Sequence, residues 1–469
     1  MSSSTVLPII SDVPPIRVRA LNNKPIANDG DYVLYWMTSF RRFESNYALQ
    51  RAVELANTVN KPLVILDALR LRYQWASARF HYFIIEGMRD LAAQDQPATY
   101  LNFIETHTDP NQNDGGYGRG LVNALSQRAC AVVGDDFPCF FLPKMHQAIA
   151  PKLPVRFELV DANGWIPLRA TVKLHLSAYD FRRWIQKNIR DYLYLPNPDP
   201  LAALNNSKAP DLDNIRKRWT FTSPADWLDP ATPYAIETLD VDQDVRRSET
   251  VGGSQTAIAE CSRFVEKRLG RYMDDRNHPD LDATSGLSAY LHFGHIASQQ
   301  IVSEIMTLED WHPDHLGLEA KGKRTEFWGM SPSAEAFMDQ VITWREVGYN
   351  FCIWRPDDYD SYSSLPDWAK QTLAEHRGDP RKEGYALDML EHAKTSDPIW
   401  NAAQRQLVQT GMMNNYLRML WAKKILQWTP APEDALEIAV HLNNKYSLDG
   451  RNPNSYSGVF WTFGRYDRP

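Results

Sequence analysis

The character of the sequence changes at a Pro- and Asn-rich stretch, Leu195–Pro200. Upstream of it, short unbroken apolar runs alternate with segments of helical periodicity; the runs are 32–37, 62–66, 99–103, 131–134 and 155–160. Strands that are apolar throughout are typical of a parallel sheet covered by helices on both faces. Downstream, helical periodicity dominates over 257–272, 296–306, 334–349 and 401–428. The sequence therefore predicts a doubly wound α/β parallel-sheet domain followed by an all-α domain.

The length of the chain supports two domains, because 469 residues exceed what one ordinary hydrophobic core accommodates. We expect a leader over 1–29, the α/β domain over 30–170, an interdomain linker over 171–215 and the helical domain over 216–469. A ligand crevice of the α/β domain would lie at the carboxyl ends of its strands. No dinucleotide-binding fingerprint occurs there, so we look for the chemistry in the helical half.

Charge, cysteines and hydropathy bound the class of protein. Because the net charge is −7, a DNA partner would need a local basic surface, such as Arg216–Arg218. The four cysteines lack metal-binding spacing, and we expect neither a metal site nor a disulfide framework. Met1–Thr5 lacks the basic start of a secretory signal, and no apolar run reaches the length of a membrane span. We expect a cytoplasmic protein with no membrane partner.

Three tryptophans near the C-terminal end stand out. Trp421 and Trp428 are seven residues apart in one predicted helix, which separates them by about two turns, or roughly 10 Å, along one face. Trp400 lies near the start of the preceding helical run, after the start signal Ser396–Pro398. Indoles at such separations can carry an electron between the surface and a buried cofactor. Large aromatics at helical spacing also simply fill cores, and spacing alone favours that interpretation.

Two further motifs could bind phosphate. Thr284–Gly294 is rich in small hydroxyl residues just before a helix, where backbone N–H groups suit a phosphate, although ordinary capping explains the same pattern. Arg345, inside a predicted helix, could clamp a phosphate or lie at the surface.

The last motif is the polar segment Leu448–Tyr456, which follows a predicted helix. Asp449 could pair with Arg418, and either Asn443 or Asn454 could form a hydrogen bond to a ring nitrogen. An Asp-Gly pair alone usually marks a turn. Each of these motifs is weak in isolation, whereas their order and spacing together are specific.

The ordered set resembles the photolyase/cryptochrome family, and the similarity is greatest to class II cyclobutane pyrimidine dimer (deoxyribodipyrimidine) DNA photolyases. The segments that carry the resemblance extend over most of the chain from about residue 16; they are 32–37, 160–168, 284–294, 397–404, 417–429 and 446–451. The resemblance implies an α/β antenna domain and a helical catalytic domain that holds FAD in a folded conformation. Relatives carry a second, deazaflavin-type antenna chromophore or none, and the first domain does not decide between these.

The resemblance also implies roles for individual residues. Arg418 and Asp449 would form an ion pair beside the flavin ring, and Asn443 or Asn454 would face flavin N5. The implied FAD-binding residues are Tyr272, Thr284, Ser285, Leu287, Ser288, Arg345, Asn401, Asn415, Arg418, Asn443, Asp449 and Asn454.

On the same resemblance, Trp421, Trp400 and Trp428 would transfer electrons to the flavin, with Trp421 nearest to it. Trp344, Met419 and Trp461 would contact the substrate. That substrate would be a pyrimidine dimer flipped out of UV-damaged DNA, onto apolar and aromatic walls that offset part of the unstacking cost. The implied activity is light-driven repair of the dimer by an electron from excited reduced FAD, in a monomeric enzyme without a metal.

Three departures from the family pattern leave an alternative function open. Asn414 stands where family members usually have His, and Val341 stands where class I enzymes have Glu. The chain also ends at Pro469, where class II relatives commonly continue. The alternative is a cryptochrome-like FAD photoreceptor or redox sensor without repair activity.

Overall fold

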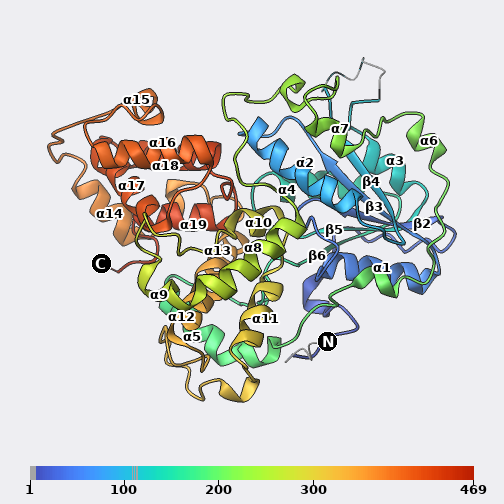
Figure 1. Ribbon diagram of the computed structural model, residues 1–469, viewed down its shortest axis with the longest axis horizontal. Coiled ribbons are helices and arrows are strands. Elements are labelled where there is room, and N and C mark those ends of the chain that lie inside the picture. The colour runs from blue at the N-terminus through green and yellow to red at the C-terminus, as the bar shows by residue number, and fades with distance from the viewer. Residues whose placement is uncertain (1–6, 108, 110, 112–114, 469) are drawn as a thin grey trace.

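The computed structural model describes residues 7–107, 109, 111 and 115–468. The expected absence of a secretory signal concerns Met1–Thr5, and these residues lie outside the described part of the chain, as does Pro469. In Figure 1 a sheet with its helices lies to the right and a body of helices to the left. The predicted order of an α/β region followed by helices is thus confirmed.

The sheet has six strands in the order β1-β6-β5-β2-β3-β4. The strands are β1 (Val18–Ala20), β2 (Tyr32–Met37), β3 (Leu63–Leu69), β4 (Thr99–Ile104), β5 (Ala129–Asp135) and β6 (Arg156–Val160). All pairs are parallel except β1 with β6. The sequence missed β1, which lies within the predicted leader, because a strand of three residues carries no alternation to detect.

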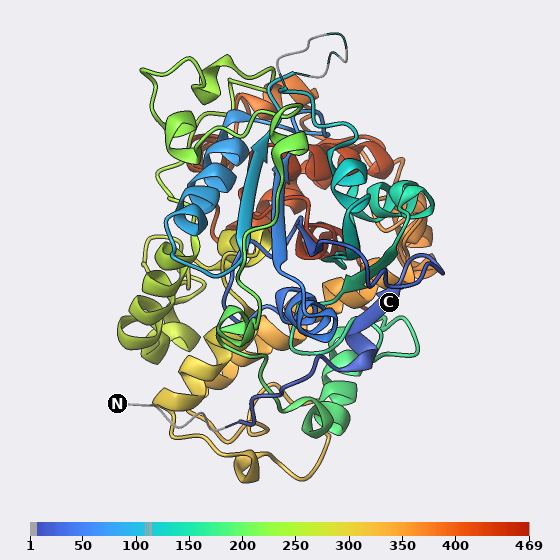
Figure 2. The same ribbon diagram turned by 90° about the vertical axis from the view of Figure 1, so that its right-hand side faces the viewer.

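Both faces of the sheet are buried, as the unbroken apolar strands predict. Val33, Tyr35 and Met37 of β2 pack on the face that α1 covers, whereas Tyr32 and Leu34 pack on the face of α3. Figure 2 shows α2 and α3 on opposite sides of the sheet. The covering helices are α1 (Tyr47–Val59), α2 (Ala78–Ala92), α3 (Leu121–Ser126) and α4 (Leu142–Ile149).

The described residues after β6 form helices joined by loops and form no further strand of the sheet. The helices are α5 (Ala178–Asn188), α6 (Asp213–Arg216), α7 (Pro224–Leu228), α8 (Ser254–Lys267), α9 (Tyr272–Asp275), α10 (Ser288–Phe293), α11 (Ser298–Leu308), α12 (Pro332–Met338), a π-helix (Asp339–Trp344), α13 (Arg345–Trp354), α14 (Asp367–Glu375), α15 (Leu387–Glu391), α16 (Pro398–Thr410), α17 (Asn415–Trp428), α18 (Pro432–Tyr446) and α19 (Pro453–Thr462). The α5 helix lies within the predicted linker, and its Phe181 and Ile185 pack into the same core as α2 and α8.

The helical run predicted over 401–428 is divided in two. Gly411 follows α16 with a φ of +75°, the left-handed conformation that commonly ends a helix and that glycine adopts without steric cost. Helix α17 then starts at Asn415, where the Asn414 side chain accepts a hydrogen bond from the backbone N–H of Tyr416. The break allows α16 and α17 to pack against each other, which brings Trp400 against Trp421.

Candidate functional site

The predicted flavin residues mostly surround one cavity of about 600 Å³ in the helical half, a volume suited to a large small-molecule ligand. It lies among α9, the loop before α10, and helices α16 to α19. The predicted residues that line it are Tyr272, Thr284, Ser285, Leu287, Ser288, Asn415, Arg418, Met419, Asn443, Asp449 and Asn454.

Two predicted flavin residues do not line this cavity, because nearer partners hold their side chains. Arg345 donates to the hydroxyl of Tyr349 at 3.0 Å and lies over that ring. The Asn401 side chain forms hydrogen bonds with the backbone and hydroxyl of Thr395. We therefore leave both residues out of the cavity wall.

An ion pair predicted from the sequence lies in the cavity wall. Arg418 donates to Asp449 at 2.9 Å, and the Ser447 hydroxyl also donates to this carboxylate. Burial alone would raise the pKa of Asp449, but the positive charge of Arg418 and the hydrogen bonds lower it to about 2. The carboxylate is therefore ionised near neutral pH. Because desolvating an ion pair is costly, such a pair is weak evidence for stability and suits control of charge at a site.

The structure separates the two candidate asparagines. Asn443 is buried and its Nδ2 donates to Asn444, but its Oδ1 has no hydrogen-bond partner among the described residues. The Nδ2 of Asn454 instead donates hydrogen bonds to the backbone carbonyls of Trp344 and Arg345, at 3.3 and 3.1 Å. A buried carbonyl oxygen without a partner is costly unless a ligand or water satisfies it. Of the two, Asn443 is the residue whose carbonyl oxygen is buried without a partner among the described residues.

The three tryptophans form a continuous row. The rings of Trp421 and Trp400 are nearly parallel with centroids 6.2 Å apart, and Trp428 meets Trp400 edge-on at 5.4 Å. All three are buried, with Trp421 only 1% exposed. Ala422, the neighbour of Trp421, lines the cavity, and the partly exposed Tyr385 contacts Trp428 at the other end. The row therefore extends from the cavity wall toward the surface, while its rings also fill the core.

Two of the predicted substrate residues stack on each other. The indoles of Trp344 and Trp461 have centroids 4.4 Å apart, and the indole N–H of Trp461 donates to Asp467. Trp461 precedes Thr462, which lines the cavity together with the third predicted residue, Met419. An aromatic surface and an apolar side chain thus occur next to the cavity.

Several residues of the wall were not predicted. They are Pro279, Asp280, Leu281, Asp282, Gly286, Gln406, Met412, Met413, Asn414, Ala422, Ser455, Gly458, Val459 and Thr462. Helix α19 contributes four of them from one face, because they are spaced three, one and three residues apart: Ser455, Gly458, Val459 and Thr462. This spacing was a usable signal, whereas the loop over 279–282 carries none.

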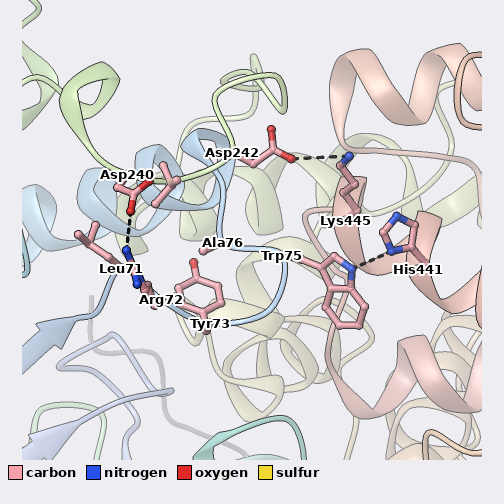
Figure 3. A pocket seen from close by; sticks show the side chains of 10 residues that line it. Leu71, Arg72, Tyr73, Trp75, Ala76, Asp240, Asp242, His441 and Lys445 are labelled. Carbon is pink, nitrogen blue, oxygen red and sulfur yellow. Dashed lines mark hydrogen bonds and ion pairs between the residues drawn. The ribbon is translucent and has the colours of Figure 1, made fainter. Parts of the chain in front are cut away.

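A second cavity, of about 650 Å³, lies where the loop after β3 meets α18 (Figure 3). Tyr73 and Trp75 contribute aromatic rings, and the Trp75 indole N–H donates to His441 at 3.2 Å. The basic side chains that line this cavity are paired with acidic ones. Arg72 pairs with Asp240 at 3.0 Å, and Lys445 pairs with Asp242 at 3.6 Å. The sequence named no residue here, although it placed a crevice at the carboxyl ends of the strands.

Arg216–Arg218, the basic segment considered for DNA, lies away from the cavity of the helical half. Helix α6 contacts α3 beside the sheet, on the opposite side of the molecule from α14 to α19 (Figure 1). The guanidinium groups of Arg216 and Arg218 lie over Phe221 and Trp219. This segment therefore does not border the cavity.

Two features are absent from the described residues. No helix there is both long and apolar enough to cross a membrane. No cluster of three or more His, Cys, Asp or Glu side chains there could hold a metal ion.

Comparison with known proteins gives one consistent result, although no family model matches the chain. A deoxyribodipyrimidine photo-lyase from Methanothermobacter thermautotrophicus is 32% identical over 96% of this chain and 90% of its own length. A photo-lyase from Arabidopsis thaliana is 32% identical over 96% of this chain and 85% of its own length. One from Oryza sativa is 34% identical over 94% of this chain and 81% of its own length.

Solved structures show the same fold. A class III photolyase from Agrobacterium tumefaciens superimposes with a TM-score of 0.66 over 93% of this chain and 80% of its own, at 17% identity. A Synechocystis cryptochrome superimposes with a TM-score of 0.65 over 94% of this chain and 83% of its own, at 14% identity. Given relatives of 32 and 34% identity along nearly its whole length, the chain belongs to the deoxyribodipyrimidine photo-lyase family.

Proposed function

We propose that this protein binds FAD in the cavity of the helical half and uses it to repair cyclobutane pyrimidine dimers in DNA in the light. The observation that carries the proposal is a cavity whose wall combines an ionised Arg418–Asp449 pair with the unpartnered oxygen of Asn443. Bound FAD would supply the absorption of light and the transferable electron.

The residues of the wall suit that cofactor. Within the part of the chain that the structure describes, Arg418 has an Nε without a hydrogen-bond partner, so both the pair and Asn443 can form further hydrogen bonds with a ligand. Ser285 and Ser288 place hydroxyls in the same wall. We assign Asn443, rather than Asn454, to accept a hydrogen bond from the flavin ring, and the Arg418–Asp449 pair to tune the charge beside it.

The tryptophan row supports the redox part of the proposal. Trp421, Trp400 and Trp428 would pass an electron inward from Tyr385 and the surface, because each ring touches the next. This route would keep the cofactor reduced between turnovers.

The aromatic pair Trp344–Trp461 and Met419 support the choice of substrate. A base or dimer that has left the stack needs an aromatic or apolar surface, and stacking contributes about 1–3 kcal/mol per base. We propose that a flipped-out dimer of UV-damaged DNA occupies this place and that one monomer is sufficient for repair.

A second, deazaflavin-type chromophore would find aromatic walls in the cavity of Figure 3, next to Tyr73 and Trp75. Added deazaflavin that binds there would sensitise flavin photochemistry, and Trp75→Ala would abolish the effect. Equal sensitisation by the variant would place the chromophore elsewhere.

The main test is light-dependent repair of a thymine-dimer oligonucleotide by the purified, reduced holoprotein, with a dark control. Repair in the light alone supports the proposal. Bound and photoreducible FAD without any repair would contradict it and favour the photoreceptor function.

A further inference from the structure

One polar side chain is buried against the tryptophan row. Gln404 of α16 is fully buried, and its Oε1 accepts a hydrogen bond from the indole N–H of Trp421 at 2.9 Å. Its Nε2 donates to the backbone carbonyl of Glu391 at 3.3 Å. Because an indole N–H can only donate and a carbonyl can only accept, these two partners fix which end of the amide faces Trp421. The ring nitrogen of Trp421 therefore meets a neutral oxygen.

That choice of acceptor matters when an indole is oxidised. Loss of an electron makes the indole N–H strongly acidic, so a neighbouring base would remove its proton and leave a neutral radical. An amide oxygen is too weak a base to do so. Trp400 is in the same situation, because its N–H donates to the backbone carbonyl of Trp421 at 3.0 Å. Neither of these two indoles donates to a group that would take its proton.

The outer end of the row differs. The hydroxyl of Tyr385, whose ring contacts Trp428, donates to the carboxylate of Glu383 at 2.9 Å. Glu383 is exposed to solvent, and its pKa is lowered by hydrogen bonds from Ser396 and Tyr385, so it is available as a base. The row thus has neutral acceptors inside and a carboxylate at its exit.

We propose that Gln404 is a positioning residue for electron transfer: it keeps the indole of Trp421 protonated while that indole is oxidised. One electron leaves Trp421 for the photoexcited flavin and no proton moves. An electron from Trp400 then restores Trp421, and the positive charge moves outward. With a base in place of Gln404, the proton would leave and the radical would stay at Trp421. The inference rests on the proposed function, because it requires a bound flavin as the oxidant.

The first experiment compares Gln404→Leu with Gln409→Leu in the holoprotein. Gln409 lies on the same helix but is exposed, so it is a matched control. Loss of the hydrogen bond to a developing positive charge should slow flavin photoreduction roughly tenfold in Gln404→Leu. Gln409→Leu should photoreduce like the wild type. An unchanged rate in Gln404→Leu would overturn the proposal.

The second experiment uses transient absorption, which distinguishes a protonated indole radical cation from a neutral indolyl radical. The wild type should show the protonated form at the inner tryptophans. Gln404→His puts a neutral base beside Trp421 and should give the neutral radical and a lower photoreduction yield. A neutral radical at Trp421 in the wild type would overturn the proposal, even if the substituted proteins fail to fold.

A repair assay distinguishes failure of this inference from failure of the proposed function. Protein reduced chemically beforehand does not need the row, so Gln404→Leu and wild type should then repair a thymine dimer at equal rates in light. Absence of repair in the wild type would contradict the proposed function instead. Equal repair combined with unequal photoreduction is the result that supports both.

Discussion

At the carboxyl ends of the strands, where the sequence predicts a crevice, the buried carboxylates are paired, whereas two residues that line the cavity in the helical half have polar atoms without a partner among the described residues. In the crevice, Asp135 accepts hydrogen bonds from the backbone N–H groups of Thr38, Ser39 and Phe40, and Arg41 pairs with Asp67 at 3.2 Å. These carboxylates are thus paired near β2, β3 and β5, where a doubly wound sheet would usually bind its ligand. The hydroxyls of Thr38, Ser39 and Tyr73 have no partner among the described residues, so the region is not free of unsatisfied polar atoms.

In the wall of the helical cavity, Asn443 Oδ1 and Arg418 Nε have no partner in the described parts of the chain. The position of a crevice in a fold therefore does not by itself identify a binding site. Unsatisfied polar atoms on residues that line a cavity are better evidence, because leaving them unpaired costs free energy unless a ligand forms hydrogen bonds with them. The following predictions test whether the two regions differ in this way.

The largest effect on ligand binding is expected for Asp449→Asn. The substitution leaves Arg418 without a counter-charge in the cavity wall, and FAD affinity should fall about 100-fold. Titration of the apoprotein with FAD, followed by flavin fluorescence, measures this. Because the pKa of Asp449 is about 2, the pair stays charged at pH 5, and FAD affinity should be the same at pH 5 and pH 7. Tight binding by the variant would remove the pair from the site.

The matched change in the crevice, Asp67→Asn, should act on stability instead. It leaves Arg41 buried without its carboxylate, and the free energy of unfolding should fall by about 3 kcal/mol. Urea unfolding measures this, and FAD titration of the folded variant should give the affinity of the wild type. A large loss of FAD affinity would show that the crevice is not independent of the cavity.

How much of this contrast the sequence could predict differs between the regions. The strands β2 to β6 follow from unbroken apolar runs, and the resemblance named slightly less than half of the residues in the cavity wall. It could not exclude Arg345 and Asn401, because the competing partners Tyr349 and Thr395 are a matter of side-chain placement. Nor could it show that Gln404 meets Trp421, since the hydrogen bond joins two helices that Gly411 separates. Local pattern predicts elements, whereas contacts between elements decide a site.

A smaller effect is expected from the two asparagines. Asn443→Ala removes an acceptor without another partner, and FAD affinity should fall roughly tenfold. Asn454→Ala is the control, because its amide serves the carbonyls of Trp344 and Arg345; it should reduce stability more than FAD affinity. Fluorescence titration and urea unfolding of both variants decide this. The reverse pattern would make Asn454 the flavin residue.

The smallest effect concerns Glu346, which joins the two regions. Its carboxylate, on α13, accepts hydrogen bonds from the backbone N–H groups of Trp165 and Ile166, the second at 2.9 Å. Burial raises the pKa of Glu346 to about 8, although the charge of Arg345 and these two hydrogen bonds lower it in part. Since the folded state then binds a proton that the unfolded state releases above the ordinary value of 4.5, stability is greatest below pH 4.5 and declines as the pH rises toward 8. Between pH 6 and 8 the free energy of unfolding should therefore fall, by on the order of 1 kcal/mol. Glu346→Gln keeps an oxygen acceptor but cannot ionise, so its unfolding free energy should lose this part of the slope. Parallel curves for both proteins would mean that Glu346 ionises normally, and that the boundary between the regions tolerates a buried charge as the cavity does.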